Sequence, residues 1–191
     1  MASKLDTLEI VDVPDRATWR AWLETHHAQP AGVWLTLYKK ESGKRLMTYA
    51  DAVEEALCFG WIDSHPRKVD ASCFLLHFSP RKPKSVWSAV NKERIVQLRE
   101  AGLLMPAGET RIATAQQNGS WDALDEVEAL IIPPDLEAAL AANDTARQYF
   151  QAFPPSARKQ LLQNLAAAKR PETRQQRIEC IVVNAAQNKR G

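Results

Sequence analysis

The pattern of apolar positions predicts short β-strands in the first half of the chain. Val33–Lys39 combines β-branched and aromatic residues and leads into the polar turn at residues 41–44, as expected for a strand. Cys73–Phe78 is a continuous apolar run and is predicted to be a strand buried on both faces. Arg67–Val69 is its predicted hairpin partner, and residues 5–13 alternate loosely enough for one more short strand.

Apolar spacing of three and four residues predicts helices between these strands. Pro14 and Asp15 open a helix to about His27. Thr48, followed three residues later by an acid, approximates a capping box for a helix from Tyr49 to Phe59, which Gly60 ends. The expected core-facing residues of the two helices are Trp19, Trp22, Leu23, His26, Tyr49, Ala52, Val53, Ala56 and Leu57, whereas Asp51, Glu54 and Glu55 are expected to face outward.

The order of these elements predicts the α+β class. From residue 33 the chain runs strand, helix, strand, strand, helix, so helices are expected to cover one face of a small antiparallel or mixed sheet. An all-helical C-terminal part follows. The predicted division is a core domain at residues 1–119, a packed linker at 120–134 and a helical region at 135–191. The expected later helices are Pro106 to Asn118, Asp135–Ala142, Thr145–Phe153, Ala157–Ala168 capped by Ser156, and Pro171 to about Gln187.

Phe59–Arg94 is the stretch in which the candidate site is expected. Ser85 is the predicted N-cap of a helix from Val86 to Ala101. On the helical wheel, Asn91 and Arg94 fall within the apolar stripe formed by Trp87, Val90, Ile95 and Leu98. A buried guanidinium needs partners, since leaving it unpaired costs several kcal/mol or more. The nearest upstream carboxylates are Asp63 and Asp70. Arg94 either ties its helix to the Asp63 turn, or lines a pocket for an anionic or amide-bearing ligand together with Asn91.

The loop from Ser79 to Ser85 is the best anion-binding candidate in the sequence. It supplies Arg81, Lys82 and Lys84 close to the predicted start of a helix, where free backbone N–H groups attract anions. Trp61 and Trp87 could add stacking surfaces. That combination suits a phosphorylated small molecule, a nucleotide or the end of a single-stranded nucleic acid. The alternative is a solvated basic loop beside two core tryptophans.

Composition narrows the remaining classes. With 25 basic and 23 acidic residues the net charge is +2, which argues against a general nucleic-acid coat. Three cysteines without C-x-x-C spacing indicate neither a disulfide framework nor a zinc site, and no phosphate-binding glycine loop is present. Without an export signal or a long apolar run, the chain is expected to be cytoplasmic and to lack a membrane span. No cofactor is expected, and the oligomeric state stays open.

Two arrangements of chemically active residues are weak in the sequence. Ser64-His65, and Ser79 near His77, offer a nucleophile and a base, but no G-x-S-x-G elbow frames them, so catalysis by them is not expected. Asp63, His65 and His77 lack a fourth ligand at motif spacing, so no metal site is predicted.

Four motifs carry a family resemblance: AVEEALCFGWID (52–63), FSPRKPKSVWSAVNKERI (78–95), GLLMPAG (102–108) and AKRPETRQQRI (168–178). In this order they resemble the YdeI/OmpD-associated family, also labelled bacteriocin-protection proteins. The resemblance implies protection against bacteriocins or cationic antimicrobial peptides and brings no established catalytic mechanism. The family-like positions are Trp61, Asp63, Arg81, Lys82, Ser85, Trp87, Asn91, Arg94, Lys169, Arg170, Glu172, Thr173 and Arg174.

Three functions therefore stay open. The first is a non-enzymatic binding or stress-protection protein whose pocket takes an anionic small molecule or nucleotide. The second is a small enzyme in which Asp63 acts as acid or base while Arg81 and Arg94 hold the charge of the substrate. Nucleic-acid binding ranks third. Lys169, Arg170 and Arg174 form a secondary candidate site.

Overall fold

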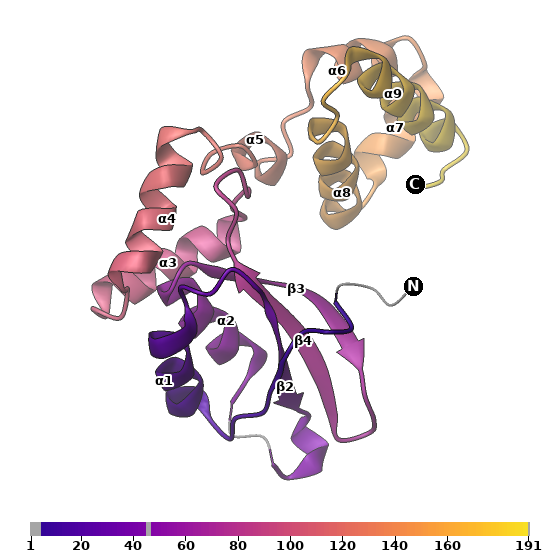
Figure 1. Ribbon diagram of the computed structural model, residues 1–191. Coiled ribbons are helices and arrows are strands. Elements are labelled where there is room, and N and C mark those ends of the chain that lie inside the picture. Colours follow the sequence, from indigo (N-terminus) through magenta and orange to yellow (C-terminus); the bar gives the residue numbers. More distant parts are fainter. Residues whose placement is uncertain (1–4, 45–46, 191) are drawn as a thin grey trace. The chain divides into compact units, whose positions relative to one another are not determined.

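The computed structural model describes residues 5–44 and 47–190 (Figure 1). The chain divides into two compact units, Met1–Trp121 and Asp122–Gly191. The first unit is α+β and the second is helical, as the sequence predicts.

The first unit contains a mixed four-stranded sheet of order β1-β2-β4-β3. Its strands are β1 (Ile10–Val11), β2 (Val33–Tyr38), β3 (Trp61–Lys68) and β4 (Cys73–Pro80). β1 and β2 run parallel, whereas β4 pairs antiparallel with both β2 and β3. β3 is an edge strand with an irregular register between Asp63 and Pro66, which is where a proline without an N–H group is tolerated. The predicted hairpin is confirmed, and β3 is longer than expected because it begins directly at Trp61.

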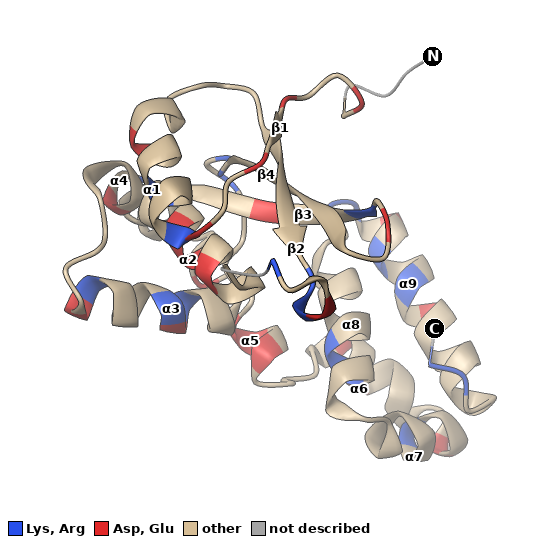
Figure 2. Ribbon diagram, turned by 90° about the horizontal axis from the view of Figure 1, so that it is seen from below, with Lys and Arg blue, Asp and Glu red and all other residues tan. Residues whose placement is uncertain are grey.

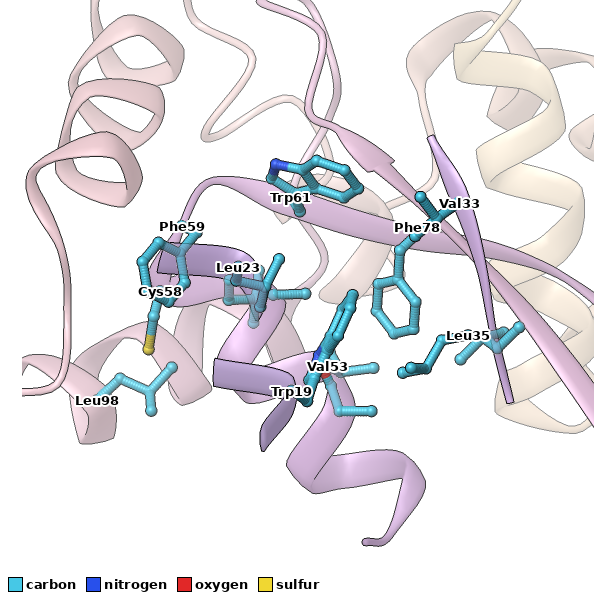
Figure 3. Close-up of a cluster of buried hydrophobic side chains, with 14 of the residues drawn as sticks. Trp19, Leu23, Val33, Leu35, Val53, Cys58, Phe59, Trp61, Phe78 and Leu98 are labelled. Atoms are coloured by element: carbon cyan, nitrogen blue, oxygen red, sulfur yellow. The ribbon is translucent and has the colours of Figure 1, made fainter. Parts of the chain in front are cut away.

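The first two helices begin where their capping residues predict. Asp15 accepts from the Thr18 N–H at 2.8 Å and starts α1 (Arg16–His26), and a complete capping box at Thr48 starts α2 (Tyr49–Cys58). α1 and α2 lie on one side of the sheet in Figure 1. The core includes the side chains of Trp19, Leu23 and Phe78, which Figure 3 shows close together. Gly60 takes a φ of 75° and turns the chain into β3.

Two predicted orientations in α2 are wrong. Tyr49, expected inside, exposes 47% of its surface. Glu55, expected outside, exposes only 3%, because Arg16 and Arg20 of α1 donate to its two oxygens at 2.6 and 2.7 Å. A buried carboxylate is tolerated here because two guanidinium groups neutralise it.

The predicted start of the next helix is also wrong. α3 spans Ala89–Glu100, and its N-cap is Ser88, whose side chain accepts from the Asn91 N–H. Ser85 instead donates its N–H to the Lys82 carbonyl in a turn. The helix therefore begins three residues later than expected, and Val90 points outward with 53% exposure while Ile95 and Leu98 are buried. α4 (Pro106–Gln117) agrees with its prediction.

The second unit is built from α5 (Asp125–Glu128), α6 (Pro134–Ala141), α7 (Asp144–Ala152), α8 (Pro155–Ala166) and α9 (Pro171–Ala186). Segment 120–134, expected as a linker, contains α5, and Val127 of α5 is buried in the core of this unit. Ile131, which belongs to this segment, is 54% exposed. Ser156 does not cap α8: Pro154 occupies the N-cap and Pro155 the first helical position, where its missing N–H costs nothing.

Candidate functional site

Arg81, directly after β4, is a nearly fully buried cation. Its backbone N–H donates to the Gly60 carbonyl at 2.9 Å, which fixes it at the end of the β3–β4 hairpin. Its side chain exposes only 2%, and its guanidinium lies 3.7 Å from the centre of the Trp87 ring. Nη1 donates to the Val86 carbonyl at 2.9 Å. In the part of the chain that the structure describes, Nε and Nη2 are buried without a hydrogen-bond partner.

The electrostatic environment of Arg81 is unfavourable for its charge. Burial lowers the pKa of Arg81 to about 10, and the negative charge of Asp63 opposes this only partly. Trp87 supplies a cation–π contact and is itself buried against Trp121, with the ring centres 5.0 Å apart. The site is therefore a desolvated guanidinium with unused donors, the kind of group to which an anion would bind.

Asp63 is held by a residue that sequence reasoning placed in the core. The Tyr49 hydroxyl donates to Asp63 Oδ2 at 2.6 Å, linking α2 to β3. Burial, with this hydrogen bond, raises the pKa of Tyr49 to about 12. The carboxylate of Asp70 is used in its own turn, where it accepts from Ser72 and Cys73, and the Ser72 hydroxyl is the main cause that lowers the pKa of Asp70 to about 2.

Arg94 makes neither of the carboxylate contacts expected for it. Its Nη1 donates to Asn91 Oδ1 at 3.1 Å, so the two predicted site residues do meet within one helix. The positive charge of Arg94 acts to lower the pKa of Tyr49, which places it electrostatically beside the Tyr49–Asp63 pair. Among the described residues no ion pair of Arg94 is formed, so the first of its two alternatives, a tie to the Asp63 turn, is not observed. Tyr49 takes the place that Arg94 was expected to fill.

The other predicted residues of the stretch have different surroundings. Trp61 is fully buried, its indole N–H donates to the His27 carbonyl at 2.9 Å and its ring meets Trp22 edge-on, so it is a core residue and offers no stacking surface (Figure 3). Lys82 is exposed and Ser85 is half-buried. The loop between them is anchored at the Pro83 carbonyl, which accepts from Asn118 and Ser120.

Of the three residues of the secondary candidate site, Arg174 has a structural partner. Arg174 of α9 donates through Nε and Nη2 to the two carboxylate oxygens of Asp135, at 2.5 and 2.9 Å. This pair lowers the pKa of Asp135 and joins α9 to α6. Arg170 occupies the N-cap position of α9, and Arg170 and Lys169 are exposed.

Ser64 and His77 form a pair that differs from the two considered in the sequence, which were Ser64 with His65 and Ser79 with His77. Ser64 Oγ and His77 Nδ1 lie 2.7 Å apart, and burial, followed by the charge of His65, lowers the pKa of His77. Sequence spacing could not reveal the contact, because it depends on the register of β3 against β4. No group of three or more potential metal ligands occurs within residues 5–44 and 47–190. None of the helices described is both long and apolar enough to span a bilayer.

The charged residues of α3 are of both signs. Basic and acidic residues alternate along α3 in Figure 2, in keeping with the near-balanced composition. The fold and site thus define a two-unit protein: an α+β unit that buries an incompletely paired guanidinium, and a separate helical unit.

The family of each unit is known from sequence comparison. Residues 11–111 match the family described as Domain of unknown function (DUF8412), which covers more than half of the chain, and residues 129–188 match the family described as Bacteriocin-protection, YdeI or OmpD-Associated. The chain belongs to the first of these families, and its residues 129–188 are similar to the second. The motif at 168–178 lies in the second match, whereas the motifs at 52–63, 78–95 and 102–108 lie in the first. No curated protein and no solved structure matches the chain.

Proposed function

We propose that this protein is a non-enzymatic binding protein that takes an anionic small molecule at Arg81. The observation that carries the proposal is the burial of Arg81 with Nε and Nη2 unpartnered. A guanidinium presents a fork of N–H donors that matches the oxygens of a carboxylate or phosphate. An anion on the two free donors would complete the hydrogen bonding of the group and balance its charge.

Access to Arg81 requires movement of the loop at residues 81–88. This loop has neither helical nor strand structure, and Trp87 covers the guanidinium. Opening of the loop exposes Nε and Nη2, and closing returns them to a low-dielectric environment in which a bound anion is held more strongly. Asp63 acts on Arg81 with its negative charge, and Arg94 adds a positive charge beside the Tyr49–Asp63 pair. They favour a ligand that carries both an anionic group and a hydrogen-bond donor.

A role in stress protection is the biological context that we attach to this binding. It rests on the family of the second unit, whose description includes bacteriocin protection. Sequestering or sensing an anionic molecule would be compatible with such a role without a chemical reaction.

The test is a thermal-shift screen against nucleotides, sugar phosphates and polyanions. Binding to the native state raises the unfolding midpoint by mass action, with about 2.7 kcal/mol gained at 100 times the Kd. We expect at least one anion to raise the midpoint of wild type, a loss of that effect in Arg81→Met, and a weaker effect in Arg94→Met. Arg99→Met is the matched control, since Arg99 lies on α3 in an exposed ion pair with Glu109. The proposal fails if no anion shifts wild type, or if Arg81→Met responds as wild type does.

The enzyme alternative is motivated by the short Tyr49–Asp63 hydrogen bond of 2.6 Å, which could position Asp63 as an acid or base. Turnover of any bound anion, abolished in Asp63→Asn, would favour this alternative over simple binding. Nucleic-acid binding would instead show affinity that falls steeply with salt concentration.

A further inference from the structure

A cavity is lined by Gly60 and by residues of α4, and Arg81 does not line it. Its volume is about 480 Å³, within the range of small-molecule sites. It is bounded by the loop after α1, the start of β3, the end of β4 and one face of α4. The residues that matter for its chemistry are His27, Gln29, Phe59, Trp61, Thr110 and Arg111.

Arg111 of α4 is the charged group of this cavity. It is half-buried, and no hydrogen bond, ion pair or ring contact of its side chain is formed within the described residues. Its Cγ lies 2.6 Å from the place where a Cβ on Gly60 would stand. Gly60 therefore does two things: its positive φ turns the chain into β3, and its missing side chain leaves room for Arg111 against the hairpin.

The other polar groups of the cavity are already engaged as donors. Gln29 Nε2 donates to the Ala31 carbonyl at 3.2 Å, and Thr110 Oγ1 donates to the Pro106 carbonyl at 2.8 Å. His27 Nδ1 lies 3.0 Å from the Leu23 carbonyl, which can only accept, so Nδ1 carries the hydrogen. Apart from the second N–H of the Gln29 amide, the unused side-chain donors of these residues belong to Arg111, so a ligand of this cavity must bring acceptors.

The remaining walls select the rest of the ligand. The partly or fully exposed side chains of Ala28, Pro30, Pro80 and Ala107 form the apolar floor of the cavity, whereas Phe59 and Trp61 are 3% and 0% exposed and contribute little surface. Arg111 is the one lysine or arginine among the described residues that line the cavity, so the cavity suits a ligand with a single negative charge. We infer that this cavity binds a small monocarboxylate with a compact apolar body, its carboxylate on the Arg111 fork and its body over the floor. The inference goes beyond the proposed function and uses different residues.

The test is an NMR titration of the full chain with phenylacetate and with the neutral isostere phenylacetamide. The Trp61 indole N–H is a suitable reporter, because it donates to the His27 carbonyl at the edge of the cavity. We expect saturable shifts of this signal with phenylacetate, at least tenfold weaker binding of phenylacetamide, and at least tenfold weaker binding of phenylacetate to Arg111→Met. Arg99→Met and Arg81→Met should bind phenylacetate as wild type does.

Arg111→Lys guards against a folding artefact, since it keeps the charge and should retain part of the affinity lost in Arg111→Met. The inference is overturned if phenylacetate gives no saturable shift at millimolar concentrations, or if Arg111→Met binds it as wild type does. It is likewise overturned if inorganic phosphate competes more tightly than phenylacetate, because the site would then not select a monocarboxylate. If only Arg81→Met loses its ligand, the proposed function stands and this second site does not.

Discussion

Replacing Arg81 by Met distinguishes a ligand-binding cation from a structural one. The lowering of the pKa of Arg81 to about 10 means that holding its charge in the folded state costs roughly 3 kcal/mol. Met has a similar length and removes that cost. The substitution also loses the cation–π contact with Trp87, worth about 2 kcal/mol when desolvated, and the hydrogen bond to the Val86 carbonyl, worth about 1 kcal/mol. These contributions nearly cancel, so we expect the free energy of unfolding to change by less than about 1 kcal/mol.

The assay is urea denaturation followed by tryptophan fluorescence. All six tryptophans lie in the first unit, so the signal reports that unit alone. Arg20→Met is the contrasting variant, because Arg20 donates to the buried Glu55 at 2.7 Å. Breaking a buried ion pair costs about 3–5 kcal/mol, and partial exposure of Arg20 reduces this to about 2–3 kcal/mol.

The reasoning is refuted if Arg81→Met loses as much stability as Arg20→Met. Arg81 would then be a structural cation whose contacts outweigh its desolvation, and its unpartnered nitrogens would no longer support an anion site. A change near zero, with loss of anion binding in the same variant, means that the charge is retained for the ligand.

Three further predictions concern packing and pH. Glu55→Gln should lower the free energy of unfolding by about 2 kcal/mol, since two guanidinium groups lose their buried counter-charge. The control is Glu24→Gln, in a half-exposed pair with Arg20, which should change the free energy of unfolding by less than about 0.5 kcal/mol. Equal effects of the two variants in urea denaturation would contradict this reasoning. Gly108→Ala should lower the free energy of unfolding by about 2–3 kcal/mol in the same assay, despite the helix propensity of alanine. The new Cβ would lie 2.4 Å from the Cys58 carbonyl oxygen and force α4 away from α2. A variant as stable as wild type would show that the two helices can move apart at little cost. The pKa of His77 in the folded protein lies below its value in the unfolded chain, so the unfolded state takes up a proton first as the pH falls. Stability should therefore decrease as the pH drops below about 6.5, and His77→Gln should flatten the dependence of stability on pH between pH 7 and 5. An unchanged slope in this variant would exclude His77 as the source of the pH dependence.

Local features of the sequence were sufficient for the element order. Asp15 and the Thr48 capping box start their helices as predicted, because a cap acts on N–H groups only two or three residues away. The apolar runs that begin at Val33 and Cys73 form strands as predicted, because about six consecutive residues are enough to show the pattern of a buried strand. Ser85 shows the limit of such signals, since Ser88 offers the same cap three residues later.

The candidate site was predicted in part. The sequence analysis placed Arg81 in a basic loop and Trp87 beside it on the next helix, and in the structure the Arg81 guanidinium lies 3.7 Å from the centre of the Trp87 ring. Tyr49, Arg111 and the partners of Glu55 were missed. For Arg111 the nearest sequence signal was Gly60, which predicted the end of a helix and did not indicate that an arginine packs against it.

What the sequence by itself determined is therefore the class, the order of the elements and the stretch that carries the charged site. Tertiary structure alone decided which charges are paired. The spacing along α2 cannot tell that Glu55 faces two arginines of α1, nor can the spacing along α3 tell that Arg94 finds Asn91 and leaves Asp63 to Tyr49. A helical wheel states which residues share a face, whereas the cost of burying a charge depends on what the neighbouring element brings within about 3 Å of it.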